Sequence, residues 1–259
     1  MIGNGFNILV IFLFGCCLGS FLNVCIYRVP RSISIAFPRS FCPHCQAPVR
    51  ACDNIPLLSY FLLGGKCRIC RAGISWRYPL VEALTGGVAL GLFLKFGPSF
   101  LFFSTLAFAA ALIVITFIDL DHRIIPDIIS LPGIAVGFLL SVFGSAVTIK
   151  ESLIGIAVGG GSLYLVAFSY QLLTKREGMG GGDVKLLAMI GAWLGWKAIL
   201  FTLFFASLSG TFIGGGAMLI QKEGRYYAIP FGPFLAFSAL AYIFIGSQMI
   251  NWYLDWGRP

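Results

Sequence analysis

Long apolar runs constrain this chain more than any other feature. Eight such runs occur, at roughly 6–27, 78–98, 99–119, 126–147, 152–174, 184–196, 198–220 and 227–249. A helix that crosses a bilayer needs about 20 apolar residues, and helices bond their own backbone groups where no water is present. We therefore predict an all-α, polytopic membrane protein with about eight transmembrane helices. The sixth run is short, so we expect it to be tilted, partly buried or joined to its neighbour.

The composition supports a membrane protein and gives it an orientation. Hydrophobic residues make up 58% of the chain and charged residues only 11%, which excludes an ordinary soluble domain and a disordered one. Eight of the 18 Lys and Arg lie in the loop 28–77, and an excess of positive charge marks cytoplasmic loops. We predict that this loop is cytoplasmic and that the N-terminus lies outside. Topology thus explains the basic balance, and we expect no nucleic-acid partner.

Three parts follow from this interpretation. Residues 1–27 form a first transmembrane helix, 28–77 a cytoplasmic loop domain, and 78–259 a transmembrane domain. The run 6–27 lacks the positively charged start of a secretory signal, so we expect a retained helix and not a cleaved signal peptide.

The loop contains two C-x2-C pairs, Cys42 with Cys45 and Cys67 with Cys70, joined by the segment 46–66. Four thiolates at this spacing can form a tetrahedral zinc site, whose metal supplies folding energy to a loop with few aliphatic residues. The site would be closed and structural. Four free thiols or two disulfides are the alternatives, and a cytoplasmic location argues against disulfides. His44 or Cys52 could replace one ligand.

Carboxylates gather at one side of the predicted membrane. Of only ten acidic residues, Asp119, Asp121, Asp127 and Asp183 lie in two short segments that threading places on the cytoplasmic face. Helix capping or ion pairing would explain any one of them, and Asp127 follows Pro126 as a helix start does. Asp119 directly follows an apolar run and should lie deepest, whereas Asp121 lies nearer to water. Capping does not explain why two separate segments place acids at the same depth.

Paired carboxylates suit proteolysis. Two carboxylates that share a site do not both ionise readily, so the ionised one can take a proton from water while the protonated one polarises a carbonyl. The glycine-rich run 178–183, which ends in Asp183, would let a substrate backbone approach. Only two histidines occur, His44 and His122, and neither lies in a nucleophile motif.

Motifs along most of the chain resemble one family. They are Gly19-Ser20-Phe21-Leu22-Asn23-Val24 with Arg28-Val29-Pro30, both C-x2-C pairs, Asp53-Asn54-Ile55-Pro56, Ser75-Trp76-Arg77-Tyr78-Pro79-Leu80-Val81-Glu82, the segment 119–127, and Gly180-Gly181-Gly182-Asp183-Val184-Lys185. In this order they resemble the bacterial type IV prepilin peptidases, bifunctional leader peptidases and N-methyltransferases of the GxGD aspartyl class.

The resemblance implies an activity and its residues. Asp119 and Asp183 would be the catalytic pair, with Asp121 the alternative to Asp119. The substrate would be a prepilin or pseudopilin of a type IV pilus or type II secretion system, cut after Gly and before a residue that is usually Phe. Cutting would occur at the cytoplasmic face of the bacterial inner membrane. The new N-terminus would then be methylated with S-adenosylmethionine, an activity that accompanies the cysteine loop in this family.

The residues themselves say less about methylation. We expect a cofactor site where the loop meets the membrane, near Asn54, Arg77 and Glu82. Glu82 lies about one turn into the second span, where an unpaired acid is costly. It could bind the amine of S-adenosylmethionine or of the substrate, or it could pair with Arg77.

Two other classes of function compete with a peptidase. A proton-coupled transporter could use the same acids as a relay, but they lie at one face and not at the bilayer midplane. A membrane thiol oxidoreductase could use the C-x2-C pairs, but cytoplasmic cysteines are normally reduced.

Overall fold

The computed structural model describes residues 5–143, 147–175, 180–221, 230–246, 248–250 and 252. Within these ranges the chain is helical, with two isolated β-bridges and no strand, so the all-α prediction is confirmed. Contacts divide the chain into two compact units, Met1–Val114 and Ile115–Pro259, which we call the N-terminal and C-terminal units. The predicted division at residues 28 and 78 stays a prediction.

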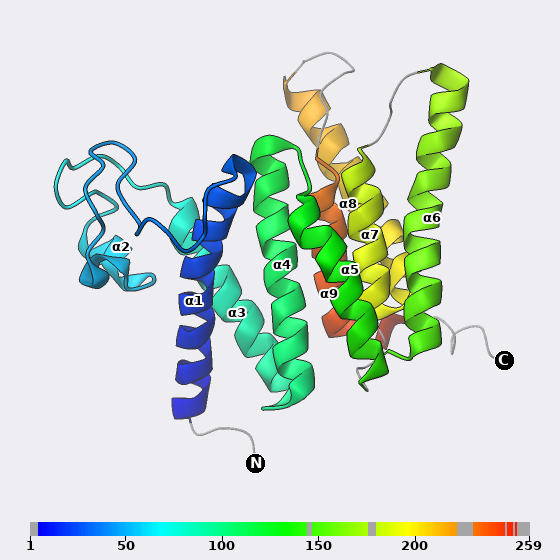
Figure 1. Cartoon of the computed structure of the whole chain (residues 1–259), viewed down its shortest axis with the longest axis horizontal. Helices are drawn as coiled ribbons and strands as arrows, with labels where there is room; N and C mark the ends of the chain where they lie inside the picture. The colour runs from blue at the N-terminus through cyan, green and yellow to red at the C-terminus, as the bar shows by residue number, and fades with distance from the viewer. Residues whose placement is uncertain are drawn as a thin grey trace. The chain divides into compact units, whose positions relative to one another are not determined.

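Each of the eight apolar runs corresponds to a helical segment in the order of the chain (Figure 1). They are α1 (Gly5–Arg28), α3 (Arg77–Phe96), α4 (Phe100–His122), α5 (Asp127–Val142), α6 (Ile149–Thr174), α7 (Gly181–Leu194), α8 (Trp196–Gln221), and α9 (Gly232–Ala241) continued by the π-helix η3 (Tyr242–Gly246). Among the described residues, five helices are long and apolar enough to cross a membrane: α1, α3, α4, α6 and α8. The chain is thus a multi-pass membrane protein, and the count of eight crossings stays a prediction.

In the N-terminal unit, α1 packs along α3. The two backbones approach closely at Gly15, where an added Cβ would lie only 2.7 Å from the Cα of Gly86. Only small residues permit this spacing. Near the other end of the contact, the side-chain amide of Asn23 donates to the carbonyl of Tyr78 over 3.1 Å. These contacts hold together the two helices that flank the loop 28–77.

The loop itself contains short helices, and its first residues are held to the end of α1. The short helices are η1 (Val29–Arg31), η2 (Ala51–Asn54) and α2 (Leu58–Leu62). Arg28, at the end of α1, is buried and donates to the carbonyls of Ser34 and Pro38 over 2.7 and 2.6 Å. A buried guanidinium needs such acceptors, so Arg28 fixes the path of the loop as it leaves α1.

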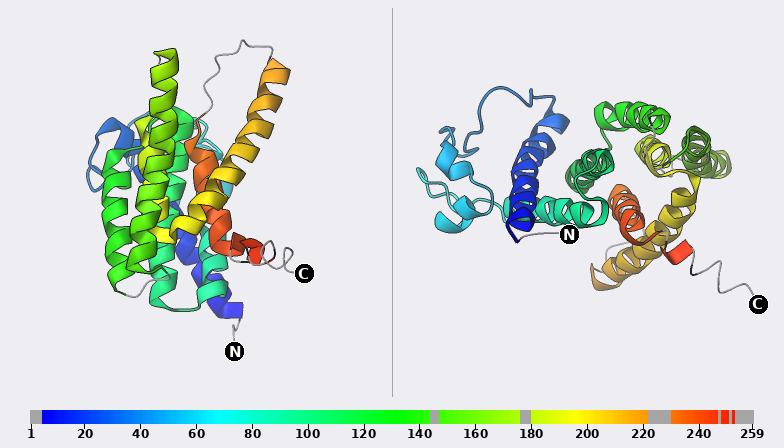
Figure 2. Two further views of the ribbon diagram at one scale, coloured as in Figure 1. Left: turned by 90° about the vertical axis from the view of Figure 1, so that its right-hand side faces the viewer. Right: turned by 90° about the horizontal axis from the view of Figure 1, so that it is seen from below.

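In the C-terminal unit, α7 is the central helix (Figure 2). It packs against α5, α6, α8 and α9, and its residues 186–192 are all buried. A Cβ on Gly155 of α6 or on Gly191 of α7 would overlap the backbone of the other glycine. Because protein and not lipid surrounds α7, this short helix need not cover the bilayer thickness. The prediction that the short sixth run is partly buried is therefore confirmed.

Helix ends decide where the acids lie. The run predicted to end at 119 continues as α4 to His122, so Asp119 and Asp121 both belong to its last turns. Residues two apart on a helix face different directions, and Asp119 is only 5% exposed whereas Asp121 is exposed. Asp119 is thus the more enclosed of the two acids, and their order of depth in the membrane stays a prediction. Helix α5 begins at Asp127, one residue after the predicted start at Pro126, which is its N-cap.

Candidate active site and cysteine cluster

Asp119 is held by a backbone amide from the far end of the chain. Its Oδ2 accepts a hydrogen bond of 3.1 Å from the N–H of Gly232, which lies 113 residues later and is the first residue of α9. A Cβ on Gly232 would lie 2.6 Å from that oxygen. Glycine is therefore the residue that brings this amide within hydrogen-bonding distance of Asp119.

Asp183 lies in the first turn of α7, is partly buried, and interacts electrostatically with Asp119. Ile125, which belongs to the first acid segment (119–127), contacts the second. A Cβ on Gly182 would lie 2.9 Å from the Cβ of Ile125, and a Cβ on Gly232 would lie 3.2 Å from its Cδ1. The two predicted acid segments therefore meet around one isoleucine.

The glycines before Asp183 leave space. A Cβ added to Gly180 or Gly181 would meet no heavy atom within 4 Å among the described residues. This open space agrees with room for a substrate backbone, while residues 178 and 179 of the predicted run lie outside the described residues.

The two remaining acids lie further out. Asp121 is exposed. Asp127 accepts two hydrogen bonds, of 2.7 and 2.8 Å, from the Nζ of Lys185. The side chains of Asp127 and Lys185 are 56% and 38% exposed, so this ion pair contributes little to stability. It does join the start of α5 to the first turns of α7, close to Asp183.

Sequence reasoning missed Gly232 and Ile125. A Gly followed by Pro at a helix start is a recognisable signal, and Pro233 does occupy the first turn of α9. That signal predicts a helix boundary and nothing more. Nothing local indicates that the amide at this boundary meets Asp119.

The four predicted cysteines come together in the loop. The sulfurs of Cys42, Cys45, Cys67 and Cys70 all lie within 4.8 Å of one another, and Cys42 Sγ lies 3.8 Å from Cys70 Sγ. Zn–S bonds of about 2.3 Å in a tetrahedron require sulfurs roughly 3.8 Å apart. The cluster therefore fits a four-thiolate zinc site.

Two equivalent turns carry the four sulfurs. In the first turn the N–H of Cys42 donates to the carbonyl of Ala47 over 2.9 Å, and in the second the N–H of Cys67 donates to the carbonyl of Ala72 over 2.8 Å. The two isolated β-bridges, 41 with 48 and 66 with 73, flank these bonds in the same way. The cluster is thus a pair of matching hairpin turns that face each other through their sulfurs.

The geometry of the turns also favours the thiolate form of Cys67. Gln46 and Arg71, equivalent positions, both have a positive φ of about 60°, which is uncommon for residues other than glycine and closes each turn tightly. Hydrogen bonds from the backbone of Cys70 and Ile69 lower the pKa of the Cys67 thiol to about 6. Such amide donors favour the anionic sulfur that a metal binds.

A cavity of about 460 Å³ lies in the N-terminal unit, between the cysteine loop, the last turns of α1 and the start of α3. Asn54 and Glu82, two of the three predicted cofactor residues, line it. Arg77 begins α3 and is partly buried, but it is not part of the cavity lining.

Glu82 holds the turn that precedes α2. It is 8% exposed, its Oε2 accepts a hydrogen bond of 2.7 Å from the N–H of Leu57, and Ser20 also hydrogen-bonds to it. Leu57 has φ +60° and ψ −53°, a sparsely populated conformation for a residue with a side chain. The carboxylate of Glu82 thus stabilises an unusual backbone turn at the cavity wall.

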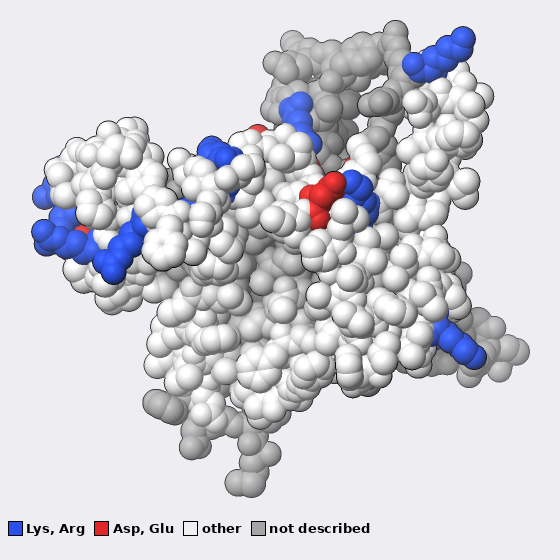
Figure 3. All heavy atoms as spheres, viewed as in Figure 1, with Lys and Arg blue, Asp and Glu red and all other residues white. Residues whose placement is uncertain are grey.

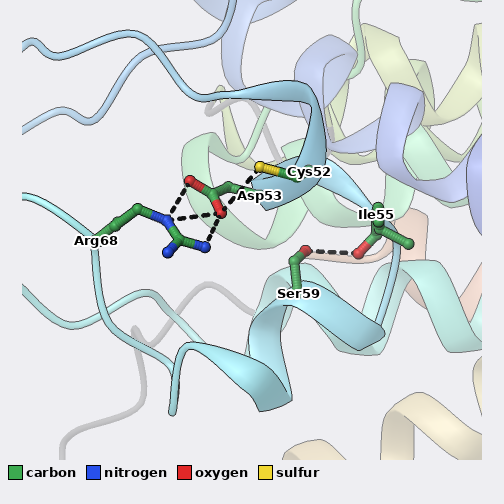
Figure 4. Close-up of polar contacts among 5 residues, drawn as sticks. All are labelled: Cys52, Asp53, Ile55, Ser59 and Arg68. Carbon is green, nitrogen blue, oxygen red and sulfur yellow. Dashed lines mark hydrogen bonds and ion pairs between the residues drawn. The ribbon is translucent and has the colours of Figure 1, made fainter.

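Figure 4 shows two further contacts of this wall. Arg68 donates to both oxygens of Asp53 over 2.6–3.0 Å, and this guanidinium lowers the pKa of the Asp53 carboxyl. The hydroxyl of Ser59 donates to the carbonyl of Ile55 over 2.6 Å. The first contact joins η2 to the second cysteine turn, and the second fixes the start of α2.

Comparisons with known proteins give consistent results. A family model described as "Bacterial Peptidase A24 N-terminal domain" matches residues 13–96, and one described as "Type IV leader peptidase family" matches residues 106–215. Similar proteins named prepilin leader peptidase/N-methyltransferase include one from Aeromonas hydrophila, 38% identical over 95% of this chain and 93% of its own. One from Neisseria gonorrhoeae is 39% identical over 93% of this chain and 92% of its own. One from Legionella pneumophila is 36% identical over 97% of this chain and 96% of its own. No solved structure matches.

Proposed function

This chain belongs to the type IV leader peptidase family, and on that premise we propose that it removes the leader peptides of prepilins and then N-methylates the new N-terminus. Asp119 and Asp183 are the proteolytic pair in this proposal. The observation that carries it is the meeting of the two acid segments around Ile125, with Asp119 buried and bonded to Gly232. The relatives' names give no support to a transporter or a thiol oxidoreductase.

The surroundings of the two acids suggest separate roles. A hydrogen bond to a charged group contributes about 1.5–3 kcal/mol, and Asp119 accepts one from Gly232. Asp183 is favoured as an anion by the first turn of α7, an effect of about 0.3–1 kcal/mol. The end of α4 disfavours an anion at Asp119 by a similar small amount, about 0.3–1 kcal/mol, so at the middle of these ranges the net preference for the anion is larger at Asp119 than at Asp183. We therefore assign Asp119 as the base that takes a proton from water and Asp183 as the acid that polarises the scissile carbonyl.

Substitution of each acid tests the pair. The full chain in lipid nanodiscs is incubated with a prepilin, and loss of the leader is measured by mass spectrometry. Asp119→Asn and Asp183→Asn should abolish cleavage, and Asp121→Asn, on the exposed face of α4, should retain it. Full cleavage by Asp183→Asn would refute the pair. An inactive Asp121→Asn beside an active Asp119→Asn would transfer the role of base to Asp121.

Methylation is proposed to occur at the loop cavity. Its volume of about 460 Å³ lies within the ~300–1,000 Å³ of small-molecule sites. S-adenosylmethionine, when bound, supplies the methyl group from a cationic sulfonium. The lining offers groups that suit a cation: the carboxylate of Glu82 and the rings of Tyr27, Tyr60 and Tyr78. Asn54 adds an amide for hydrogen bonding, and a role for Arg77 stays a prediction.

A structural zinc ion completes the proposal. Cys42, Cys45, Cys67 and Cys70 would hold it and leave no position for water, so its role is to fold the loop that forms the cavity wall. The loop is proposed to lie on the cytoplasmic side of the bacterial inner membrane, because its Lys and Arg far outnumber its acids.

A further inference from the structure

The short helix α2 exposes an apolar face that the proposed chemistry does not use. Leu58, Phe61 and Leu62 are 53%, 72% and 76% exposed. The opposite face is different, because Ser59 is buried and Tyr60 lines the cavity. Exposed apolar side chains gathered on one face usually mark a contact surface.

The position of α2 indicates what covers this face. Within the N-terminal unit, α2 lies beside the length of α1 and not beyond its end (Figures 1 and 2). Helix α1 is long and apolar enough to cross a membrane. An element beside a helix that is long and apolar enough to cross a membrane lies within reach of the lipid, so the bilayer is the candidate occupant of the apolar face of α2.

The charge around α2 agrees with a lipid surface. Eight Lys and Arg lie between residues 28 and 77 against one acid, Asp53, which is already paired with Arg68. Lys66 follows α2 closely and is exposed, as is Arg71. Figure 3 shows basic side chains gathered on this loop. Basic residues beside exposed aromatic and aliphatic ones are typical of segments that lie in the interface of anionic membranes.

We propose that α2 is an interfacial anchor of the loop. Leu58, Phe61 and Leu62 insert among the acyl chains of the surrounding bilayer, and Lys66 and Arg71 contact anionic headgroups. The anchor holds the cavity at the membrane surface, where the N-terminus of a membrane-embedded substrate would arrive. That last consequence rests on the proposed function, and the anchor itself does not.

Photocrosslinking in the full chain tests the anchor without an activity readout. p-Benzoylphenylalanine replaces Phe61 in protein reconstituted in nanodiscs of phosphatidylcholine with phosphatidylglycerol. Irradiation should give phospholipid adducts detected by mass spectrometry. The matched control replaces Phe204, which is 63% exposed on the predicted membrane-crossing helix α8, and should also give them. Adducts at 204 with none at 61, or crosslinks from 61 to protein alone, would overturn the proposal, and Leu62 provides a second labelling position if the first variant does not fold.

The contribution of charge has its own comparison. Lys66→Gln with Arg71→Gln should lower the adduct yield at position 61 severalfold in anionic nanodiscs and leave it nearly unchanged in pure phosphatidylcholine. Equal yields in both lipids, with and without these substitutions, would show that headgroup charge has no part in the anchor. Prepilin cleavage, measured in the same samples, reports separately on the proposed function.

Discussion

Replacement of Gly232 by alanine is the sharpest perturbation of the proteolytic site. The new Cβ would lie 2.6 Å from Oδ2 and 3.2 Å from Cγ of Asp119, where ordinary contact begins at 3.4 Å. The carboxylate must therefore retreat by about 0.8 Å. Movement along the present hydrogen bond would lengthen it from 3.1 Å to about 3.9 Å, beyond hydrogen-bonding distance.

Two independent estimates give the size of the effect. Loss of a hydrogen bond to a charged group, about 1.5–3 kcal/mol, corresponds to a roughly ten- to hundredfold fall in rate. A displacement of about 1 Å at a catalytic group can reduce the rate roughly a hundredfold. We expect kcat for prepilin cleavage to fall by this amount in Gly232→Ala, measured at saturating prepilin in nanodiscs. Gly161→Ala is the matched control, because a Cβ there meets no heavy atom within 4 Å in the part of the chain that the structure describes.

The pH profile separates positioning from a general structural defect. The amide of Gly232 favours the ionised form of Asp119, and cleavage needs that form. Loss of this hydrogen bond should therefore move the acidic limb of the profile of kcat against pH to higher pH. The neighbouring Asp183, on which the charge of Asp119 acts, is not substituted in the variant. If Gly232→Ala cleaves prepilin with the unchanged kcat and the acidic limb of its pH profile does not move, the reasoning is refuted.

Three further predictions concern the cysteine loop, the cavity and the outer ion pair. Cys42→Ser should lose zinc and methylation but keep cleavage. Because the pKa of the metal-free Cys67 thiol is about 6 and bound zinc competes with protons for the sulfur, zinc should be retained at pH 7 and released only at a pH below about 6, which a colorimetric chelator measures. Glu82→Gln keeps the shape of the side chain and removes its charge, so methyl gain by mass spectrometry should fall at least about tenfold with cleavage intact. Asp127→Asn breaks the exposed pair with Lys185 and removes a charge from the first turn of α5, so it should change the free energy of unfolding by about 1 kcal/mol or less, measured by denaturant titration. Loss of cleavage in this variant would show that Asp127 takes part in catalysis.

The helices were predictable because their cause is local. Each apolar run became a helical segment, and the helical repeat explains why Asp119 is buried while Asp121, two residues later, is exposed. The spacing of the cysteine pairs likewise predicted the cluster, because two C-x2-C pairs can supply the four thiolates of one zinc site. Bonds between near neighbours in the chain close each of the two turns. The repetition of the turn 41–48 at 66–73 is also visible in the sequence, but sequence reasoning did not use it.

Contacts between distant residues decided the rest. The sequence by itself determined an all-helical membrane protein, a four-cysteine cluster and two acids at one face, since hydrophobic periodicity and short motifs act over a few residues. Only the tertiary structure placed the amide of Gly232 on Asp119, Ile125 of the first acid segment against Gly182 of the second, and the carboxylate of Glu82 on the N–H of Leu57. These contacts join residues 25 to 113 positions apart, and their partners are chosen by how the helices pack, which no local pattern records.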